Sequence, residues 1–256
     1  MPRQIDDLTA AQAALREVFS GGGRIVVLTG AGISTESGIP DYRSPGGIWS
    51  RMAPVQYAEF VEDKAQRLED WRRRFIFHGD FTRTHPNAAH LALAQEAEAG
   101  RVQLVITQNI DGLHQRAGLP EDSLVELHGN GTYASCLSCG QRADLMAQEE
   151  LASAGRSPRC AVCGGLLKAA VISFGQSMPE EPWQRAVAAS READVFVVVG
   201  SSLQVYPAAR LPEIAVEAGA EMMIVNQQPG PLDDLASLLI RTPAAATFDA
   251  LLSGKN

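Results

Sequence analysis

Residues 25–44 read IVVLTGAGISTESGIPDYRS, and this stretch decides the fold. The branched apolar residues 25–28 suit a strand that is buried on both faces. Gly30 and Gly32 follow at once, and Ser34 stands where a helix would begin and where a hydroxyl can cap free backbone N–H groups. A strand that ends in glycines before a helix N-terminus favours an anion, because the N–H groups and the helix dipole both face it. We therefore predict a phosphate-holding loop.

The loop matches the dinucleotide pattern Gly-x-Gly-x-x-Gly only in part, because Thr35 stands at the third glycine position. A tight turn that binds nothing explains the glycines as well. Residues Pro40, Asp41, Tyr42 and Arg43 favour a nucleotide site. They place a charge pair and an aromatic ring just past the loop, where a sugar and a base would lie.

Composition limits the classes of protein to which the chain can belong. Its 256 residues, 45% of them apolar, suffice for one large domain or for a domain with an inserted module. The net charge of −8 argues against a general nucleic-acid binder. The basic run Arg72-Arg73-Arg74 is expected to form a solvated helix face. We find no apolar run of the ~20 residues that span a bilayer and no signal peptide. We expect a cytoplasmic protein with no membrane partner and no direct nucleic-acid partner.

Strands alternate with helices along the chain. We predict buried strands over 25–28, 102–107, 124–127, 194–199 and 222–225, and helices over 7–20, 180–190, 207–219 and 245–252. This order predicts an α/β fold with a doubly wound, Rossmann-like parallel sheet. Ligands of such sheets bind beyond the carboxyl ends of the strands. The polar residues that follow these strands are Gln108, Asn109, Asp111, His128, Ser201, Ser202 and Asn226.

Two insertions are expected within this single domain of residues 1–256. Residues 49–99 show no convincing strand and carry apolar residues at helical spacing, which predicts a helical insertion. Residues 129–167 are expected to form a small metal-binding module. The Rossmann-like core then comprises residues 1–48, 100–128 and 168–256.

Four cysteines form two Cys-x-x-Cys pairs, namely Cys136 with Cys139 and Cys160 with Cys163. Two such pairs can provide a tetrahedral thiolate cage for zinc. Two redox pairs or four unrelated core thiols are the other interpretations. Because all four ligand positions would be filled, the metal would hold the fold together and do no chemistry. A zinc ribbon can also bind nucleic acid, but the acidic charge argues against it.

One histidine differs from the other four. His78, His85, His90 and His114 lie in or beside helical segments, where capping or packing explains them. His128 follows a strand and precedes a glycine, so it is free to act as a general base, with an intrinsic pKa near working pH. Asn109 and Asp111 lie on a strand-end loop, where capping a turn is the alternative.

Several motifs, taken together and in this order, resemble the sirtuins, the NAD-dependent protein deacylases. They are GAGISTESGIPDYR at 30–43, TQNIDGLH at 107–114, LHG at 127–129, the two cysteine pairs, GSS at 200–202 and Val225-Asn226. The resemblance covers nearly the whole chain, and the wording of residues 34–44 looks most like the class II branch.

The resemblance implies NAD as co-substrate and one structural Zn²⁺. His128 would be the general base, Asn109 a catalytic residue that contacts the ribose, and Asp111 a contact of the nicotinamide carboxamide. Tyr42 stands where many sirtuins have Phe. The implied NAD contacts are Gly30, Ala31, Gly32, Ser34, Glu36, Pro40, Asp41, Tyr42, Arg43, Trp49, Gln108, Asn109, Ile110, Asp111, Gly200, Ser201, Ser202, Asn226, Gln227 and Ala245.

The implied reaction removes acyl groups from protein lysines, so the partners would be acyl-lysine proteins or peptides. The amide oxygen would attack C1′ of the nicotinamide ribose, nicotinamide would leave, and the products would be free lysine and O-acyl-ADP-ribose. His128 would activate a ribose hydroxyl on the way.

The implied substrate contacts are Val171, Ile172, Phe174 and Gly175. Here the chain departs from the family, which often reads Lys/Arg-Pro-Asp-Val-Val-x-Phe-Gly-Glu, whereas residues 168–176 read KAAVISFGQ. Backbone pairing with an added peptide strand survives such changes. Trp71 and Arg74 stand where the branch that removes negatively charged acyl groups has Tyr and Arg. Arg74 could still meet a carboxylate, but the missing tyrosine argues against desuccinylation.

Two other functions fit the same residues. ADP-ribosyl transfer or NAD hydrolysis would use the same site, and His128 favours deacylation without excluding them. A non-catalytic NAD sensor or a zinc-stabilised binding module is the third interpretation. Asn109, Asp111 and His128 together argue against it, since a sensor needs no base.

Overall fold

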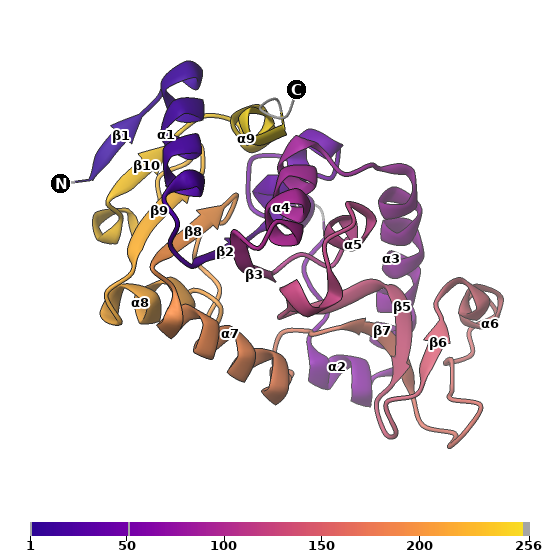
Figure 1. Cartoon of the computed structure of the whole chain (residues 1–256). Helices are drawn as coiled ribbons and strands as arrows, with labels where there is room; N and C mark the ends of the chain where they lie inside the picture. The colour runs from indigo at the N-terminus through magenta and orange to yellow at the C-terminus, as the bar shows by residue number, and fades with distance from the viewer. Residues whose placement is uncertain (1, 51, 253–256) are drawn as a thin grey trace.

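A seven-stranded sheet organises the molecule in the computed structural model, which describes residues 2–50 and 52–252 (Figure 1). The strand order is β1-β10-β9-β8-β2-β3-β4, and every neighbouring pair is parallel. The strands are β1 Arg3–Ile5, β2 Ile25–Thr29, β3 Val102–Thr107, β4 Leu124–Glu126, β8 Val195–Val199, β9 Glu221–Val225 and β10 Leu238–Ile240. The interior strand β2 is buried along its whole length, as its apolar run predicts.

Helices cover both faces of this sheet, which confirms the doubly wound fold. On one face lie α1 (Leu8–Ser20), α4 (Ala88–Glu98) and α9 (Ala244–Leu252), whose apolar sides pack with β2 and β3. On the other lie α7 (Glu180–Glu192) and α8 (Arg210–Glu217). The short helix α5 (Leu113–Arg116) follows β3.

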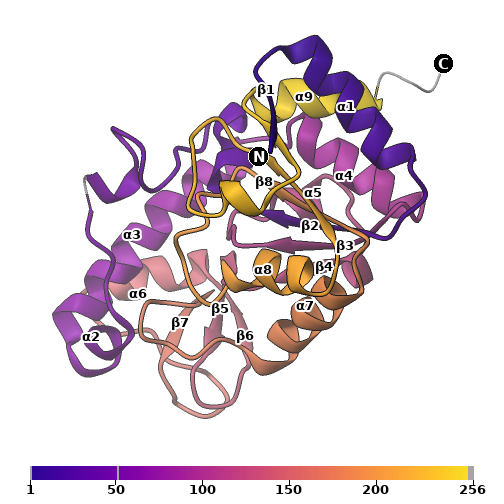
Figure 2. The ribbon, with the colours of Figure 1, turned by 90° about the vertical axis from the view of Figure 1, so that its left-hand side faces the viewer.

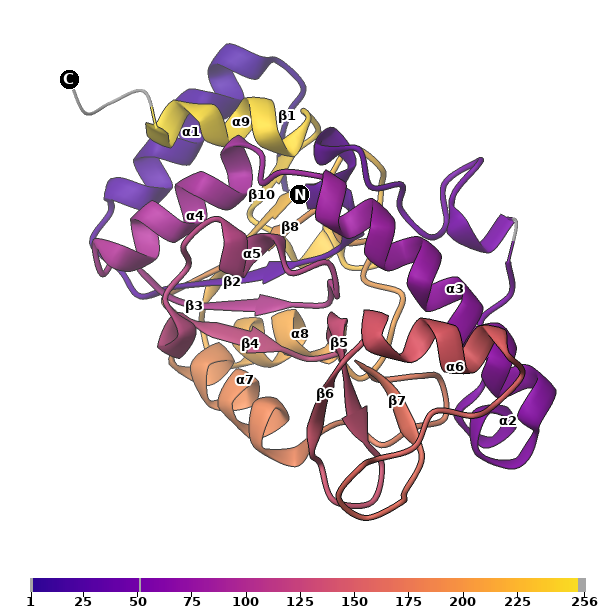
Figure 3. The same ribbon diagram turned by 90° about the vertical axis from the view of Figure 1, so that its right-hand side faces the viewer.

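A second layer, called the small layer below, lies beside the main sheet (Figure 3). Strand β5 (Gly129–Cys136) pairs antiparallel with β6 (Arg142–Asp144) and β7 (Leu167–Val171). Helices α2 (Tyr57–Glu62), α3 (Lys64–Arg83) and α6 (Glu149–Ser153) pack with this small sheet around a core that contains Phe60 and Trp71. The helical insertion and the cysteine-bearing segment therefore form one layer. Helix α4, which lies within the insertion expected over residues 49–99, packs instead on the main sheet. Strand β7, which was expected in the core of residues 168–256, pairs instead in the small sheet.

Some elements differ from the sequence-based expectation. The edge strand β1 and its neighbour β10 have three residues each and were not predicted. The helix expected after the glycine loop is a seven-residue 3₁₀ helix, Ala31–Ser37, which ends at Gly38 with φ of 95°.

Within residues 2–50 and 52–252, no helix combines the length and the apolar character that crossing a membrane requires.

Candidate active site

A cleft of about 430 Å³ opens where the carboxyl ends of the main-sheet strands face the small layer. The loops after β2, β3, β8 and β9 line one side of it, and α3 and the end of β7 line the other. Figure 2 shows these strand ends and the small layer on either side of the connecting loops. A smaller cavity of about 100 Å³ adjoins it, and Gly32, Gly200 and Asn226 line both.

The glycines let two strand-end loops touch. The N–H of Gly32 donates to the carbonyl of Gly200 at 2.8 Å. A Cβ on Gly32 would lie 2.8 Å from Gly200, and one on Gly200 would lie 2.2 Å from the nitrogen of Ile33. Gly200 also has φ of +62°, which other residues rarely adopt. Positions 32 and 200 therefore need glycine because the two loops pack directly against each other there. Both glycines also line the cleft.

His128 lines the cleft from the connection between β4 and β5. Its Nδ1 lies 3.0 Å from the carbonyl oxygen of Gln108, which can only accept, so Nδ1 carries the proton of the neutral ring. Nε2 is then the free acceptor, as a general base requires. Burial lowers the pKa of His128, and the Gln108 carbonyl offsets part of this effect. The imidazole is therefore neutral at neutral pH.

Asn109 and Asp111 are tied to the glycine loop through Ser34. The Asn109 amide donates to the carbonyl of Gly30 at 3.1 Å and to the Ser34 hydroxyl at 3.2 Å. Ser34 donates in turn to Asp111 Oδ2 at 2.8 Å, and Asp111 Oδ1 caps α5 at Leu113. Burial raises the pKa of Asp111. The hydrogen bond to Leu113 confirms the capping alternative for Asp111, whereas Asn109 lines the cleft.

Two buried histidines lie behind this network. The rings of His90 and His114 are 5.0 Å apart, and His90 Nε2 lies 3.4 Å from the Ser34 hydroxyl. Burial lowers the pKa of His90 to about 4 and that of His114 well below its ordinary value. Both rings are therefore neutral packing residues, as their helical positions predict.

An aromatic cluster covers one side of the cleft. The ring centroids of Tyr42 and Trp49 are 5.3 Å apart, and those of Trp49 and Phe174 are 5.5 Å apart. The Arg43 guanidinium lies over the Trp49 ring at 4.2 Å. Asp41 caps the turn by accepting from the backbone nitrogens of Arg43 and Ser44. The loop after Pro40 thus reaches across to the segment that follows β7.

At the other end of the cleft, side chains hold the loops after β8 and β9. Gln108 donates to the Ser201 hydroxyl at 2.8 Å, which links the ends of β3 and β8. Asn226 donates to the carbonyl of Gln228 at 2.8 Å, and Arg241 donates to the same carbonyl at 3.0 Å. Hydrogen bonds from side chains therefore tie these loops together at this end of the cleft.

The segment after β7 is an exposed continuation of the small sheet. The N–H of Ile172 donates to the carbonyl of His128 at 2.8 Å, and the N–H of Tyr57 donates to the carbonyl of Phe174 at 2.9 Å. Phe174 is exposed, as is Tyr206 on the facing loop, and both line the cleft.

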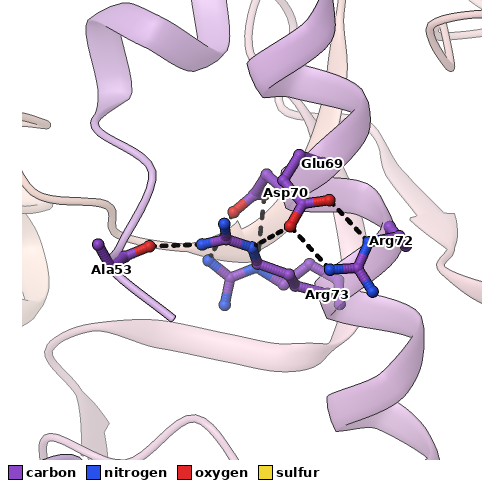
Figure 4. Close-up of polar contacts among 6 residues, drawn as sticks. Ala53, Glu69, Asp70, Arg72 and Arg73 are labelled. Carbon is purple, nitrogen blue, oxygen red and sulfur yellow. Dashed lines mark hydrogen bonds and ion pairs between the residues drawn. The ribbon is translucent and has the colours of Figure 1, made fainter. Parts of the chain in front are cut away.

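The basic run of α3 does not form one solvated face, which corrects the expectation. Arg72 alone is well exposed, whereas the side chains of Arg73 and Arg74 are 18% and 17% exposed and line the cleft. Figure 4 shows Glu69 bridging Arg72 and Arg73, and Arg73 donating to the carbonyl of Ala53. The run winds around the helix, so its members meet different surroundings.

The four cysteine sulfurs converge, all within 4.8 Å of one another. Pairs such as Cys136–Cys163 and Cys139–Cys160 are 3.5 and 3.8 Å apart. A tetrahedral site with Zn–S bonds of about 2.3 Å places sulfurs about 3.8 Å apart. The donor set and its spacing fit zinc and leave no ligand position open. The metal would join the β5–β6 turn to the segment before β7.

Most of the predicted NAD and substrate residues line the large cleft. Glu36 and Gln227 line the small cavity instead, whereas Ser34, Pro40, Asp111 and Ala245 line neither. Glu36 accepts from the backbone nitrogen of Ala245 at 2.6 Å and so links the glycine loop to α9. Arg74, which the resemblance places at the acyl-specificity position, lines the cleft, and the cleft residues that the sequence did not suggest include Met52, Pro54, Val55, Asp70, Arg73, Phe77, Val205, Tyr206 and Pro207. Helical phase alone assigns Asp70 and Arg74 to one face, but not to the cleft.

Comparisons with known proteins agree with this geometry. The model of the Sir2 family matches residues 30–207. An NAD-dependent protein deacetylase 1 of Bradyrhizobium diazoefficiens is 48% identical over 242 residues, which are 94% of this chain and 95% of that one. An NAD-dependent protein deacetylase of Rhodopseudomonas palustris is 46% identical over 94% of this chain and 96% of its own. A solved structure described as Sir2 with a p53 peptide and NAD⁺ superposes with a TM-score of 0.83 at 34% identity, covering 94% of this chain and 97% of that one. The chain belongs to the Sir2 family.

Proposed function

We propose that this protein removes acyl groups from protein lysines in an NAD-dependent reaction, with His128 as the general base. The observation that carries the proposal is the position of His128. Its Nδ1 is held by the Gln108 carbonyl, and its ring lies between the strand-end loops and the segment after β7. A neutral imidazole placed there can take a proton from a ribose hydroxyl.

The strand-end loops fit NAD. When bound, NAD supplies an electrophilic ribose carbon and nicotinamide as leaving group. The backbone of Gly30, Ala31 and Gly32 would hold the diphosphate, and Asn109 would orient the nicotinamide ribose. Gly200, Ser201 and Asn226 would hold the adenosine half. These residues line a continuous cleft, which supports the assignment.

The segment after β7 would bind the substrate peptide. Residues Val171, Ile172, Phe174 and Gly175 continue an edge of the small sheet, where an extended peptide can add a strand. Tyr206 faces them from the loop after β8. A peptide between the two segments would direct its acyl-lysine into the cleft towards His128.

The test is mass spectrometry of the products formed from NAD and one peptide carrying acetyl-, butyryl-, longer fatty, lipoyl- or succinyl-lysine. Deacylated peptide together with matching O-acyl-ADP-ribose is expected. Free ADP-ribose or ADP-ribosylated protein without deacylated peptide would move the function to NAD hydrolysis or ADP-ribosyl transfer on the same site. No NAD turnover with any peptide would contradict an enzymatic function.

We also propose that the protein acts in the cytoplasm as a single catalytic unit of residues 1–256. Four thiolates must stay reduced to bind zinc, which favours a reducing compartment. Cell fractionation with an antibody to the native protein tests the cytoplasmic location. Limited proteolysis tests whether residues 1–256 form a single unit.

A further inference from the structure

We propose that Asp70 is a specificity-determining residue: it neutralises Arg74 in the wall of the cleft, so that the site takes neutral acyl groups and disfavours acyl groups that end in a carboxylate. The inference rests on the deacylase function proposed above. It concerns the end of the cleft beyond His128, away from the strand-end loops.

Helix α3 forms this end of the cleft. Asp70, Arg74 and Phe77 line it together with Val55 and with Val171 at the end of β7. Helix α3 packs against β5 and β7 of the small layer (Figure 3), so its cleft-facing side lies opposite the nucleotide-holding loops. An acyl group on a lysine that reaches His128 would extend towards these residues.

Arg74 is already occupied by a carboxylate. Its Nη2 lies 3.0 Å from Asp70 Oδ1 and its Nε lies 3.4 Å from Asp70 Oδ2. The guanidinium therefore makes a bidentate contact with a carboxylate that lies one helical turn before it. The Asp70 side chain is 5% exposed and that of Arg74 is 17% exposed, so water screens the pair little. Arg73, the other arginine at this end, is paired with Glu69 (Figure 4).

A third charged group lies behind the pair. Lys168 is fully buried, donates to the carbonyl of Val171, and lies near the ring of Phe60. The pKa of Lys168 is lowered to about 7, mainly by burial and also by the nearby Arg74, while Asp70 offsets part of the effect. Asp70 is thus the carboxylate that balances the cationic groups in this wall. A carboxylate arriving on an acyl chain would have to share the Arg74 guanidinium with Asp70, and the two like charges would repel.

The variant Asp70→Asn tests the proposal. Asparagine keeps the size and the acceptor oxygen that Arg74 contacts, but removes the negative charge. The measured quantity is the ratio of kcat/KM for succinyl-lysine to kcat/KM for acetyl-lysine in one peptide sequence at saturating NAD. We expect a ratio below about 0.1 in the unchanged protein and a rise of about tenfold or more in Asp70→Asn, because the freed cation attracts the carboxylate.

Two further variants make the result specific. Asp80→Asn makes the same chemical change on the same helix at a solvent-exposed pair with Arg83, so it should leave the ratio unchanged. Asp70→Asn combined with Arg74→Gln should lose the gain, because the cation itself is then absent. Both peptides meet the same protein sample, so a partly unfolded variant lowers both rates and leaves the ratio unaffected.

The outcomes separate the two proposals. Turnover of the acetyl peptide with an unchanged ratio in Asp70→Asn would overturn the role of Asp70. A preference of the unchanged protein for the succinyl peptide would also overturn the role of Asp70. Absence of turnover with both peptides and NAD in the unchanged protein would instead overturn the proposed deacylase function.

Discussion

The imidazole Nδ1 of His128 lies 3.0 Å from the main-chain carbonyl oxygen of Gln108. The two residues follow the neighbouring parallel strands β4 and β3, so the sheet itself sets their separation. Because a carbonyl only accepts hydrogen bonds, this contact fixes which ring nitrogen is protonated and leaves Nε2 as the acceptor that the proposed general base would use.

Replacing His128 should abolish deacylation while NAD binding persists. We expect His128→Ala to lower kcat by about 10²- to 10⁴-fold, the usual contribution of general acid–base catalysis. Calorimetric NAD binding should change little, because the glycine loops and Asn226 remain. His85→Ala is the matched control, since His85 is exposed and lies outside the cleft lining. Full turnover by His128→Ala would refute the assignment of the base.

The pH dependence should follow the neutral form of His128. Burial lowers the pKa of this histidine, so the active neutral ring persists to lower pH than a free histidine would. We expect kcat/KM to be flat at neutral pH and to fall on acidification, with a midpoint below about 6.5. A profile whose acid limb has its midpoint above that value would contradict the burial argument.

Zinc removal should disrupt the small layer first. Without a metal, four thiols whose sulfurs lie within 4.8 Å of one another have only weak contacts to hold them. We expect Cys160→Ser or a chelator to lower the melting temperature and to increase hydrogen exchange over residues 129–167. Activity should fall indirectly, because β7 belongs to the edge that we propose to bind the peptide. A metal-free protein that is folded and active would disprove a structural role for zinc.

Stability should fall in mild acid because His90 is buried in its neutral form. Its pKa is about 4 in the folded protein, against 6.5 ordinarily, so the unfolded chain binds more protons between these values. The free energy of unfolding should therefore decrease as pH falls from about 6.5 to 4, by about 3 kcal/mol for this group. Urea titrations at pH 7 and pH 5 measure the loss. His90→Gln should show a shallower pH dependence, and an unchanged slope would assign the loss to other groups.

Gly200 should tolerate no side chain. A Cβ there would lie 2.2 Å from the nitrogen of Ile33, and the backbone has φ of +62°. We expect Gly200→Ala to separate the loops after β2 and β8 and to weaken NAD binding by at least about tenfold, since such strain costs on the order of 1–3 kcal/mol. Gly22→Ala is the control, because Gly22 also has positive φ but open space around it. Equal NAD affinities for the two variants would contradict the packing argument.

Much of the fold could be predicted from the sequence because its signals are local. The apolar run at 25–28, the helical spacing over 7–20 and the cysteine spacing each depend on neighbouring residues. They gave the parallel sheet, its helices and the thiolate cage. Strands β1 and β10 were not predicted, because it is pairing with β9 and with each other that makes them strands.

The sequence by itself determined the chemistry that is available: a glycine-rich strand end, one histidine free of a helix, and four paired thiols. Only the tertiary structure decided which side chains share the cleft. It placed Asp111 behind Ser34, divided the arginine run between solvent and cleft, and buried Trp71 in the core of the small layer while Arg74 lines the wall. The reason is physical: burial and charge pairing arise from contacts between distant segments, such as α3 against β7, and these contacts leave no local pattern in the chain.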